Sequence, residues 1–579
     1  PKSPKPIMMN ANPPVEAVAY HFQTLAANEG KLCIEEFKLL AAASAKIEMQ
    51  TIHGENNKGK NRFKNILPYD STRVVLSTAN GQSDYINGNY VDCYNQPHKY
   101  IATQGPLPKT ETDFWRMVWE SKCRVIVMLT NLLEGNKRKC HKYWPEIGAL
   151  GKHGDLIIEC VNETSYGGYV IREMKVTNNK TTRKLKQFHF TSWPDHNVPI
   201  TTTSLHRFKC AVLDYHKSNQ VDNSPIVVHC SAGAGRTGTF IGFDSLMAEM
   251  DHRSCVNVFE TVLAMRKQRV DMVQNSKQYL LLHKLVAEDC KIGNTDFSVE
   301  ELEERIQRLE KNSRLGVDNS GKSGFAHELE KLSQMKQLLK PESKTQCKVL
   351  TYQHKCVIAL IIKHSNIKGA AYDASFVESY SESLEIIVAA GPTHESLENF
   401  WHAVTSNNVG RIVSLRSLQE ERKLGFQFLP SQQPLMINDI TIEEQSKSTS
   451  GCIADKSLMI TTPRGKNMVR YFHFQTWDPD TVPNTTAELI DLVKRLQAQT
   501  GKGKLMIFCS DGINRSGAFV ALINLMERVN IEGSIDIFRT VKDLRDMRIG
   551  MVSTELLYKF LHNTMVDYVS TFQVYSNFG

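Results

Sequence analysis

A cysteine and an arginine, five residues apart, lie in a glycine-rich segment, Pro225–Phe240, that reads PIVVHCSAGAGRTGTF. The β-branched run Ile226–Val228 indicates a buried strand before Cys230, and a helix-like segment follows Arg236. In a strand–loop–helix unit of this kind, glycines let backbone N–H groups turn inward, and the helix points its positive dipole end at the same place. The segment therefore predicts a cradle for a tetrahedral dianion.

The same segment predicts a reactive thiol. Cysteines at helix N-termini and beside cations have low pKa values, so we expect Cys230 to be a thiolate that can attack phosphorus. The alternative interpretation is a buried structural cysteine with an arginine nearby.

The run HCSAGAGRTG resembles the signature loop of the protein tyrosine phosphatases, which has His-Cys, five residues, Arg, and then Ser or Thr. The spacing of Cys and Arg alone is shared with rhodaneses and other phosphatases, but the whole run after a strand is specific. The resemblance implies that Cys230 is the nucleophile, that Arg236 binds phosphate oxygens, and that His229 and Thr237 hydrogen-bond around the thiolate. It also implies that the loop between them binds the substrate phosphate, through Ser231, Ala232, Gly233, Ala234 and Gly235.

The segment FTSWPDHNVP, residues 190–199, resembles the mobile acid loop of that family. A tyrosyl oxygen leaves far better when it is protonated, so a carboxylic acid must reach the site opposite the thiolate. Asp195 is the candidate. Pro194 and Pro199 would stiffen the loop so that it moves as a lid.

The basic segment Lys60–Asp70 resembles the loop that sets pocket depth in the family. The resemblance implies that Phe63 stacks on the substrate ring and that the residues after it, Asn65 among them, hold the peptide backbone. The family usually has Tyr at the position of Phe63. A deep pocket would exclude phosphoserine, although Phe63 could instead be a core residue.

Three further side chains are expected at the site by resemblance. Glu134, which precedes the KCHKYWP run, would pair with Arg236 and orient its guanidinium for bidentate contact with phosphate. Gln274 would position the water that hydrolyses the phosphocysteine, and Gln278 would assist it. The alternative for all three is an exposed surface position.

The whole pattern occurs twice, since Cys230 and Arg236 recur as Cys509 and Arg515. We therefore predict an α/β (α+β) fold class: two tandem tyrosine-phosphatase domains, each a twisted mixed sheet flanked by helices, with the Cys-x5-Arg loop between strand and helix. The predicted divisions are a disordered lead-in at 1–14, an active domain at 15–293, a helical linker at 294–317 and an inactive domain at 318–579. A coiled-coil partner site is the alternative for the linker.

The second copy departs from the pattern at its site. Its acid loop, WDPDTVP, puts Pro479 where Asp195 stands and displaces Asp480 by one residue. Asp511 replaces Ala232, and its negative charge should raise the thiol pKa of Cys509 and repel phosphate. We therefore predict a catalytically silent second domain that serves binding, regulation or stability.

Composition limits the other classes of function. The net charge of +8 comes with short basic clusters rather than the long stripe typical of a nucleic-acid binder, so no nucleic-acid partner is expected. The 13 cysteines are scattered without CxxC pairs, which argues against a disulfide framework or a zinc site and for a reducing compartment. We expect no metal and no cofactor.

The tandem arrangement resembles the cytoplasmic region of a receptor-type tyrosine phosphatase. This implies phosphotyrosine proteins as partners, with intramolecular or intermolecular contacts through the second domain. It also implies a location at the cytoplasmic face of the plasma membrane, with a tether only through a segment absent from this chain, which begins Pro1-Lys2 without Met. The alternatives are a phosphotyrosine-binding pseudophosphatase scaffold and a dual-specificity phosphatase.

Overall fold

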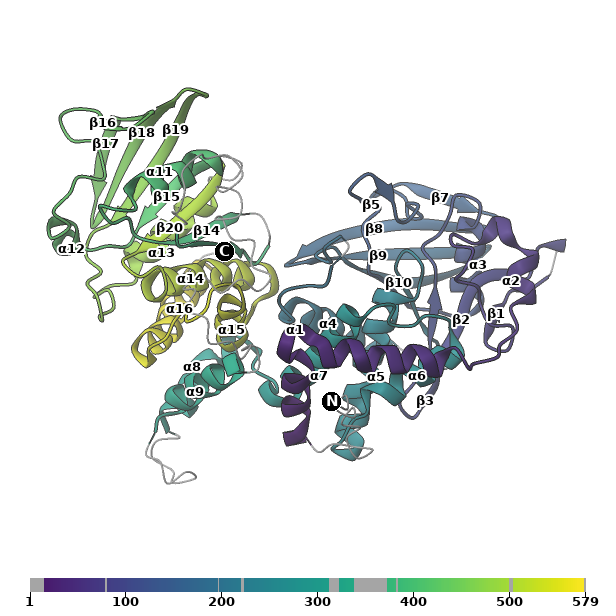
Figure 1. Ribbon diagram of the computed structural model, residues 1–579. Coiled ribbons are helices and arrows are strands. Elements are labelled where there is room, and N and C mark those ends of the chain that lie inside the picture. Colours follow the sequence, from purple (N-terminus) through teal and green to yellow (C-terminus); the bar gives the residue numbers. More distant parts are fainter. Residues whose placement is uncertain are drawn as a thin grey trace. The chain divides into compact units, whose positions relative to one another are not determined.

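The computed structural model describes residues 15–78, 81–195, 197–219, 223–311, 322–337, 372–381, 384–498 and 503–576. The expected lead-in at 1–14 and the end of the expected linker, 312–317, lie outside the described residues. The chain forms two compact units: of the described residues, those up to Gly293 belong to the first, and those from Asn294 to Lys336 and from Tyr372 onward belong to the second (Figure 1).

A nine-stranded mixed sheet forms the centre of the first unit, in the order β1-β2-β3-β11-β4-β10-β9-β8-β7. Its middle strands, β3, β11, β4 and β10, run parallel, and the others are antiparallel. Parallel strands are covered on both faces, which explains why the runs of β4 and β11 are apolar and wholly buried. The strands are β1 Arg73–Val75, β2 Tyr85–Cys93, β3 Gln96–Thr103, β4 Val125–Met128, β7 Leu150–His153, β8 Leu156–Tyr166, β9 Tyr169–Asn178, β10 Thr181–Phe190 and β11 Ile226–His229.

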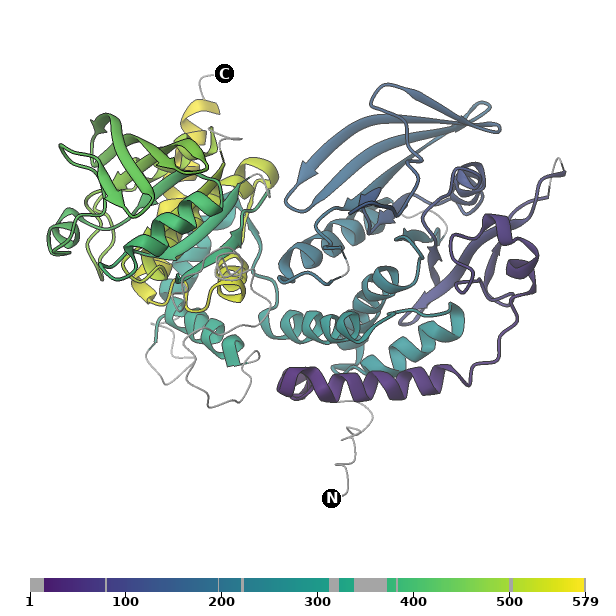
Figure 2. The ribbon, with the colours of Figure 1, turned by 45° about the horizontal axis from the view of Figure 1, so that its top comes forward.

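Helices cover the two faces of this sheet. On one side α1, α5, α6 and α7 pack against one another, and on the other Phe114 and Trp115 of α3 enter the core with side chains of β3, β4 and β11 (Figures 1 and 2). The hairpin of β5 (Leu133–Glu134) and β6 (Lys137–Arg138) forms a separate two-stranded sheet. The helices are α1 Val15–Ser44, α2 Ile52–Asn56, η1 Lys58–Lys60, α3 Glu111–Glu120, α4 Thr203–Asn219, α5 Gly235–Arg253, α6 Val258–Gln268 and α7 Ser276–Ile292.

The second unit repeats this architecture with an eight-stranded mixed sheet, in the order β13-β14-β20-β15-β19-β18-β17-β16. The predicted fold class and its duplication are thus confirmed. The strands are β13 Ala374–Glu378, β14 Glu385–Ala390, β15 Val409–Ser414, β16 Leu435–Ile437, β17 Ile440–Ser450, β18 Ile453–Thr462, β19 Gly465–Phe474 and β20 Lys504–Cys509. The helices are α8 Leu302–Lys311, α9 Gly324–Gln337, α11 Leu397–Ser406, α12 Leu418–Arg422, α13 Ala487–Gln497, α14 Asn514–Glu532, α15 Ile537–Met547 and α16 Glu555–Ser576.

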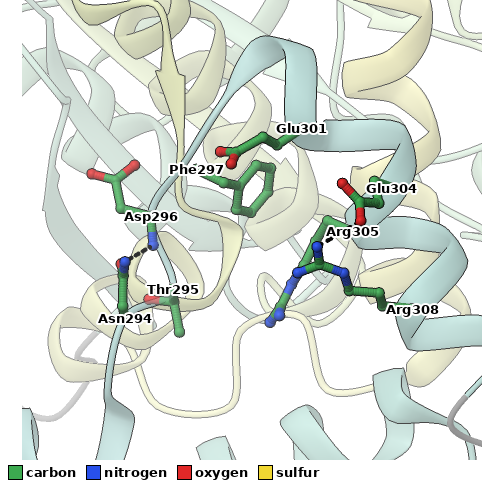
Figure 3. A pocket seen from close by; sticks show the side chains of 8 residues that line it. All are labelled: Asn294, Thr295, Asp296, Phe297, Glu301, Glu304, Arg305 and Arg308. Carbon is green, nitrogen blue, oxygen red and sulfur yellow. Dashed lines mark hydrogen bonds and ion pairs between the residues drawn. The ribbon is translucent and has the colours of Figure 1, made fainter.

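The segment 294–311, expected as part of a linker, groups with the second unit. Strand β12 (Phe297–Ser298) pairs with β21 (Ser534–Ile535), a 3-10 turn, η3 (Val299–Glu301), follows, and α8 contacts α16. Leu302 and Leu309 of α8 are buried, so this helix contributes to the core. Figure 3 shows a pocket of about 190 Å³ that residues 294–297 line together with charged side chains of η3 and α8.

Among the described residues, no helix combines the length and the hydrophobicity needed to cross a membrane.

Candidate active site

The loop between β11 and α5 closes around the sulfur of Cys230. The backbone N–H of Gly233 donates to Cys230 Sγ at 3.3 Å. Gly233 has φ +71°, and a Cβ there would lie 2.1 Å from the carbonyl oxygen of Thr103. Only glycine allows the turn this close to β3, so the sequence places the amide at the sulfur.

A buried arginine holds the outer side of the same loop. Arg269 is 0% exposed, and it donates to the carbonyl oxygens of Gly233 at 2.6 Å and Ala232 at 3.1 Å. Its other contacts are the side-chain oxygens of Asn87 and Asn89, both at 2.8 Å. With the carbonyls held outward, the amides of the loop are free to face inward. Sequence reasoning missed Arg269.

The surroundings of Cys230 favour its thiolate. Burial alone would raise the pKa of the thiol, but hydrogen bonds from the Thr237 side chain and backbone and the charge of Arg236 hold that pKa below its ordinary value.

The imidazole of His229 contacts the carbonyl oxygen of Cys230. Nδ1 lies 3.2 Å from that oxygen, and Nε2 lies 2.8 Å from the hydroxyl of Tyr143. The ring sits at the end of β11 inside the core, where burial lowers the pKa of His229 to about 4. The imidazole is therefore neutral at pH 7. Its contact with the Cys230 carbonyl supports the loop from the side of the core.

Arg236 and Glu134 form a bidentate pair. Nη1 lies 2.5 Å from Oε1 and Nη2 lies 2.9 Å from Oε2, and Nη1 also donates to the carbonyl oxygen of Leu129 at 3.1 Å. Burial would raise the pKa of Glu134, but its hydrogen bond with Arg236 and the charge of that arginine hold it below its ordinary value. The guanidinium plane is thereby fixed by the β5–β6 hairpin.

Lys139, which the sequence patterns did not single out, links Asp195 to the Arg236–Glu134 pair. Lys139 Nζ is 3.5 Å from Asp195 Oδ1 and 3.5 Å from Glu134 Oε2. The acid loop is closed internally by a hydrogen bond from Trp193 Nε1 to the carbonyl oxygen of Asn197 at 3.0 Å. The structure thus brings Asp195 and Glu134 to one cation. The sequence signal for Lys139 is its position as the first residue of the KCHKYWP run.

The two glutamines lie beside the start of α5. The backbone N–H of Gln274 donates to Oε1 of Gln278 at 2.9 Å, and Asn275 caps α7 by accepting from the N–H of Gln278. A Cβ on Gly235 would lie 2.8 Å from the amide of Gln278 and 2.9 Å from Oε1 of Gln274. Both amides therefore contact the phosphate loop.

Phe63 and Asn65 lie on the loop that follows η1, and both are exposed, Phe63 at 40%. Arg62 attaches this loop to the segment after β3 by donating to the carbonyl oxygens of Gly105 at 3.1 Å and Pro106 at 2.7 Å. Gly105 in turn donates to the carbonyl oxygen of Ser231 at 3.0 Å, so the two loops are neighbours.

In the second unit, the carboxylate of Asp511 accepts hydrogen bonds from the loop that would otherwise face a bound phosphate. Oδ1 of Asp511 accepts from Cys509 Sγ at 3.0 Å and from the backbone N–H groups of Ile513 at 2.9 Å and Asn514 at 3.3 Å. Burial, followed by the charge and hydrogen bond of Asp511, raises the pKa of the Cys509 thiol. This loop holds a protonated thiol and amides that are already satisfied.

Arg515 keeps a bidentate partner, which sequence reasoning missed. It lies 2.5 Å and 2.7 Å from the two oxygens of Glu420, and hydrogen bonds from Arg515 and Ser510 outweigh burial and lower the pKa of Glu420 to about 2. Glu420 also completes a capping box with Ser417 at the start of α12. The S-x-x-E spacing that ends at Glu420 is visible in the sequence, but this spacing predicts the start of a helix rather than a functional site.

The acid loop of the second unit is closed by the same kind of hydrogen bond as that of the first. Trp477 Nε1 donates to the carbonyl oxygen of Thr481 at 3.0 Å, the same four-residue span as from Trp193 to Asn197. On this register Pro479 corresponds to Asp195. Asp480 follows one position later, with φ +57°.

A family model described as protein-tyrosine phosphatase matches residues 57–288 and again residues 341–567. The chain is 36% identical to human receptor-type tyrosine-protein phosphatase epsilon, over 98% of this chain and 83% of that protein. It is 33% identical to human receptor-type tyrosine-protein phosphatase alpha, over 98% and 72%. With rat receptor-type tyrosine-protein phosphatase F the identity is also 33%, over 97% of this chain and 30% of that longer protein. With the duplicated site, these matches show that the chain belongs to the receptor-type protein-tyrosine phosphatases and carries two tandem copies of the family's domain.

Proposed function

We propose that the first domain hydrolyses phosphotyrosine in proteins through a phosphocysteine intermediate and that the second domain is non-catalytic. The observation that carries the proposal is the contrast between two equivalent cysteines. The sulfur of Cys230 accepts from the backbone N–H of Gly233, whereas the sulfur of Cys509 donates to Asp511, and these surroundings hold the pKa of Cys230 down and raise that of Cys509.

In the first step Cys230 Sγ attacks phosphorus in line, and the bond from phosphorus to the tyrosyl oxygen breaks. Arg236 and the inward-facing loop amides stabilise the charge on the equatorial oxygens. Asp195 gives its proton to the leaving phenolate oxygen, so tyrosine departs neutral.

In the second step water attacks the phosphocysteine. Asp195, now a carboxylate, takes a proton from that water, and Gln274 with Gln278 orients it beside the loop. The bond from sulfur to phosphorus breaks, inorganic phosphate leaves, and the Cys230 thiolate is restored. Splitting one displacement into two is the gain of the covalent route.

The second domain is proposed to serve regulation, stability or binding. The contacts of Asp511 support this proposal, because a phosphate group would have to displace a carboxylate from the same amides. We further propose that the chain is the cytoplasmic region of a single-pass receptor, and that phosphotyrosine proteins are its partners.

The first prediction tests both halves of the proposal on the full chain with a phosphotyrosine peptide. Cys230→Ser should abolish phosphate release, and Asp195→Ala should lower kcat by about 100-fold or more, because the general acid is lost. Cys509→Ser, the matched change in the second unit, should leave turnover unchanged.

Residual turnover in Cys230→Ser that disappears in the Cys230→Ser/Cys509→Ser double variant would contradict a silent second domain. Equal hydrolysis of a phosphoserine peptide would instead favour a dual-specificity phosphatase, because the deep pocket proposed at Phe63 excludes the shorter side chain.

A further inference from the structure

Two histidines and a glutamate of the first unit converge outside the phosphate loop. His21 and Glu36 come from the two parts of α1, on either side of its kink at Ala27–Gly30, and His283 comes from α7. Nε2 of His21 lies 3.8 Å from Oε2 of Glu36, and Nε2 of His283 lies 3.7 Å from Oε1. One donor atom from each of the three lies within 4.8 Å of the others.

These separations are too long for hydrogen bonds, which join nitrogen and oxygen at about 2.7–3.2 Å. His283 is only 4% exposed, and its Nε2 has no hydrogen-bond partner among the described residues. A buried nitrogen without a partner costs free energy. The three groups therefore face a common point without satisfying one another.

The cluster could close around a small dication at that point. Zn²⁺ bound tetrahedrally at about 2.0–2.1 Å holds its ligand atoms about 3.4 Å apart, so the three donors, which lie within 4.8 Å of one another, would move closer on binding, by up to about 1.4 Å. The phenol of Tyr279 donates to Oε1 of Glu36 at 2.5 Å and fixes the carboxylate from behind, as outer-shell partners of metal ligands do. His21 and Glu36 are partly exposed, which leaves a path for the ion.

The second unit has the same constellation with a built-in cation. Tyr558, the counterpart of Tyr279, donates to Oε2 of Glu328 at 2.7 Å, and Oε1 of that carboxylate pairs with Arg305 of α8, whose side chain is drawn in Figure 3. In the first unit Glu36 pairs with no lysine or arginine of the described chain, and the carboxylate oxygen that does not accept from Tyr279 faces the imidazole of His21.

We propose that His21, Glu36 and His283 bind a transition-metal dication of the Zn²⁺ class. Two imidazoles and one carboxylate form a ligand set that Zn²⁺ uses in proteins, with a fourth position for water. The ion supplies the positive charge that Arg305 supplies in the second unit, and it fastens both parts of α1 to α7. The ligands are far apart in the sequence and include no cysteine, so the absence of CxxC pairs does not bear on this site.

The experiment titrates the full chain with Co²⁺ and Zn²⁺ in the Cys230→Ser background, which removes the reactive thiolate as a competing ligand. We expect one equivalent of Co²⁺ with the visible absorption of a tetrahedral site, its displacement by Zn²⁺, and a rise in Tm on metal addition. His21→Gln and Glu36→Gln should each weaken binding by more than about 100-fold, because loss of outer-shell partners alone costs about 10–100-fold. Glu36→Gln keeps an acceptor for Tyr279.

Two further variants make the test specific. His21→Arg introduces the guanidinium of the second unit, and it should raise the metal-free Tm while abolishing the rise on metal addition. His402→Gln removes a histidine that pairs with one carboxylate, Glu398, and should change nothing.

Absence of saturable binding to the parent protein would overturn the proposal. So would equal Co²⁺ affinity in the parent and in His21→Arg. Since every protein in this test lacks the Cys230 nucleophile, the result is independent of the proposed phosphatase mechanism.

Discussion

At the scale of single residues, the two cysteines differ because of what faces each sulfur. Both follow a buried strand, and both precede an arginine held by a glutamate, Arg236 by Glu134 and Arg515 by Glu420. The difference lies in the loop, where Asp511 brings a carboxylate to the sulfur of Cys509. Burial raises the pKa of both thiols; at Cys509 the carboxylate of Asp511 raises it further, whereas at Cys230 Thr237 and Arg236 lower it.

We expect the thiolate of Cys230 to depend on Thr237. The pKa of Cys230 lies below the ordinary thiol value. Its sulfur is therefore ionised at pH values where ordinary thiols are protonated, and iodoacetamide should alkylate it there. Thr237→Ala should move the midpoint of alkylation rate against pH upward, and Thr237→Ser, which keeps the hydroxyl, should restore it.

The same shift has a consequence for stability. A depressed pKa in the folded state means that ionisation stabilises the fold above the unfolded-state pKa, and that this contribution is lost as the pH falls through the folded-state pKa. In the alkylation experiment, an unchanged midpoint pH in Thr237→Ala would show that Arg236 and the loop amides are enough to hold the pKa of Cys230 down.

At the scale of elements, the site depends on how tightly the β11–α5 loop is held between its neighbours. β3 approaches it at Gly233, and Arg269, at the end of α6, holds its carbonyls. Arg548 holds the second loop in the same way, through the carbonyl oxygen of Gly512 at 2.7 Å. The support of the loop by a buried arginine is thus kept in both units.

Gly233→Ala should destabilise the protein by at least about 3 kcal/mol, because left-handed strain and a steric clash add. It should also lower kcat/KM by about 100-fold or more, as loss of an oxyanion donor does. Gly148→Ala is the matched control, since Gly148 has φ +76° but no heavy atom within 4 Å of the added Cβ. It should cost about 1 kcal/mol and leave activity intact.

Urea denaturation and steady-state kinetics of the two variants make the measurement. Equal losses of stability and activity in Gly233→Ala and Gly148→Ala would mean that backbone strain alone, and not the approach of β3, makes glycine necessary at position 233.

At the scale of the whole molecule, the chain divides into two units, and the second begins earlier than the sequence indicates. Residues 294–311 join it through the β12–β21 pair and through buried side chains of α8. Thr295 donates to Asp536 at 2.9 Å, and Arg305 pairs with Glu328 within the same unit. The proposed boundary therefore lies near residue 294.

A fragment of residues 294–579 should be more stable than one of residues 318–579 by about 3 kcal/mol or more, because the shorter one loses the buried Leu302 and Leu309. Urea denaturation of the two fragments measures the difference. The double variant Leu302→Ala/Leu309→Ala in the longer fragment is the control, and it should reproduce most of the loss of stability. Equal midpoints for the two fragments would contradict the boundary.

The phosphate loop, the acid loop, the duplication and the departures of the second copy can all be read from the sequence, because each is a contiguous run whose residue types follow from local chemistry. The fold was needed to find the contacts of Arg269, Lys139 and Glu420, the grouping of 294–311 with the second unit, the contact of His229 with the Cys230 carbonyl, and the cluster of His21, Glu36 and His283. These are single residues of common types, brought together across long stretches of chain by sheet order and helix packing. Local pattern does not carry that information.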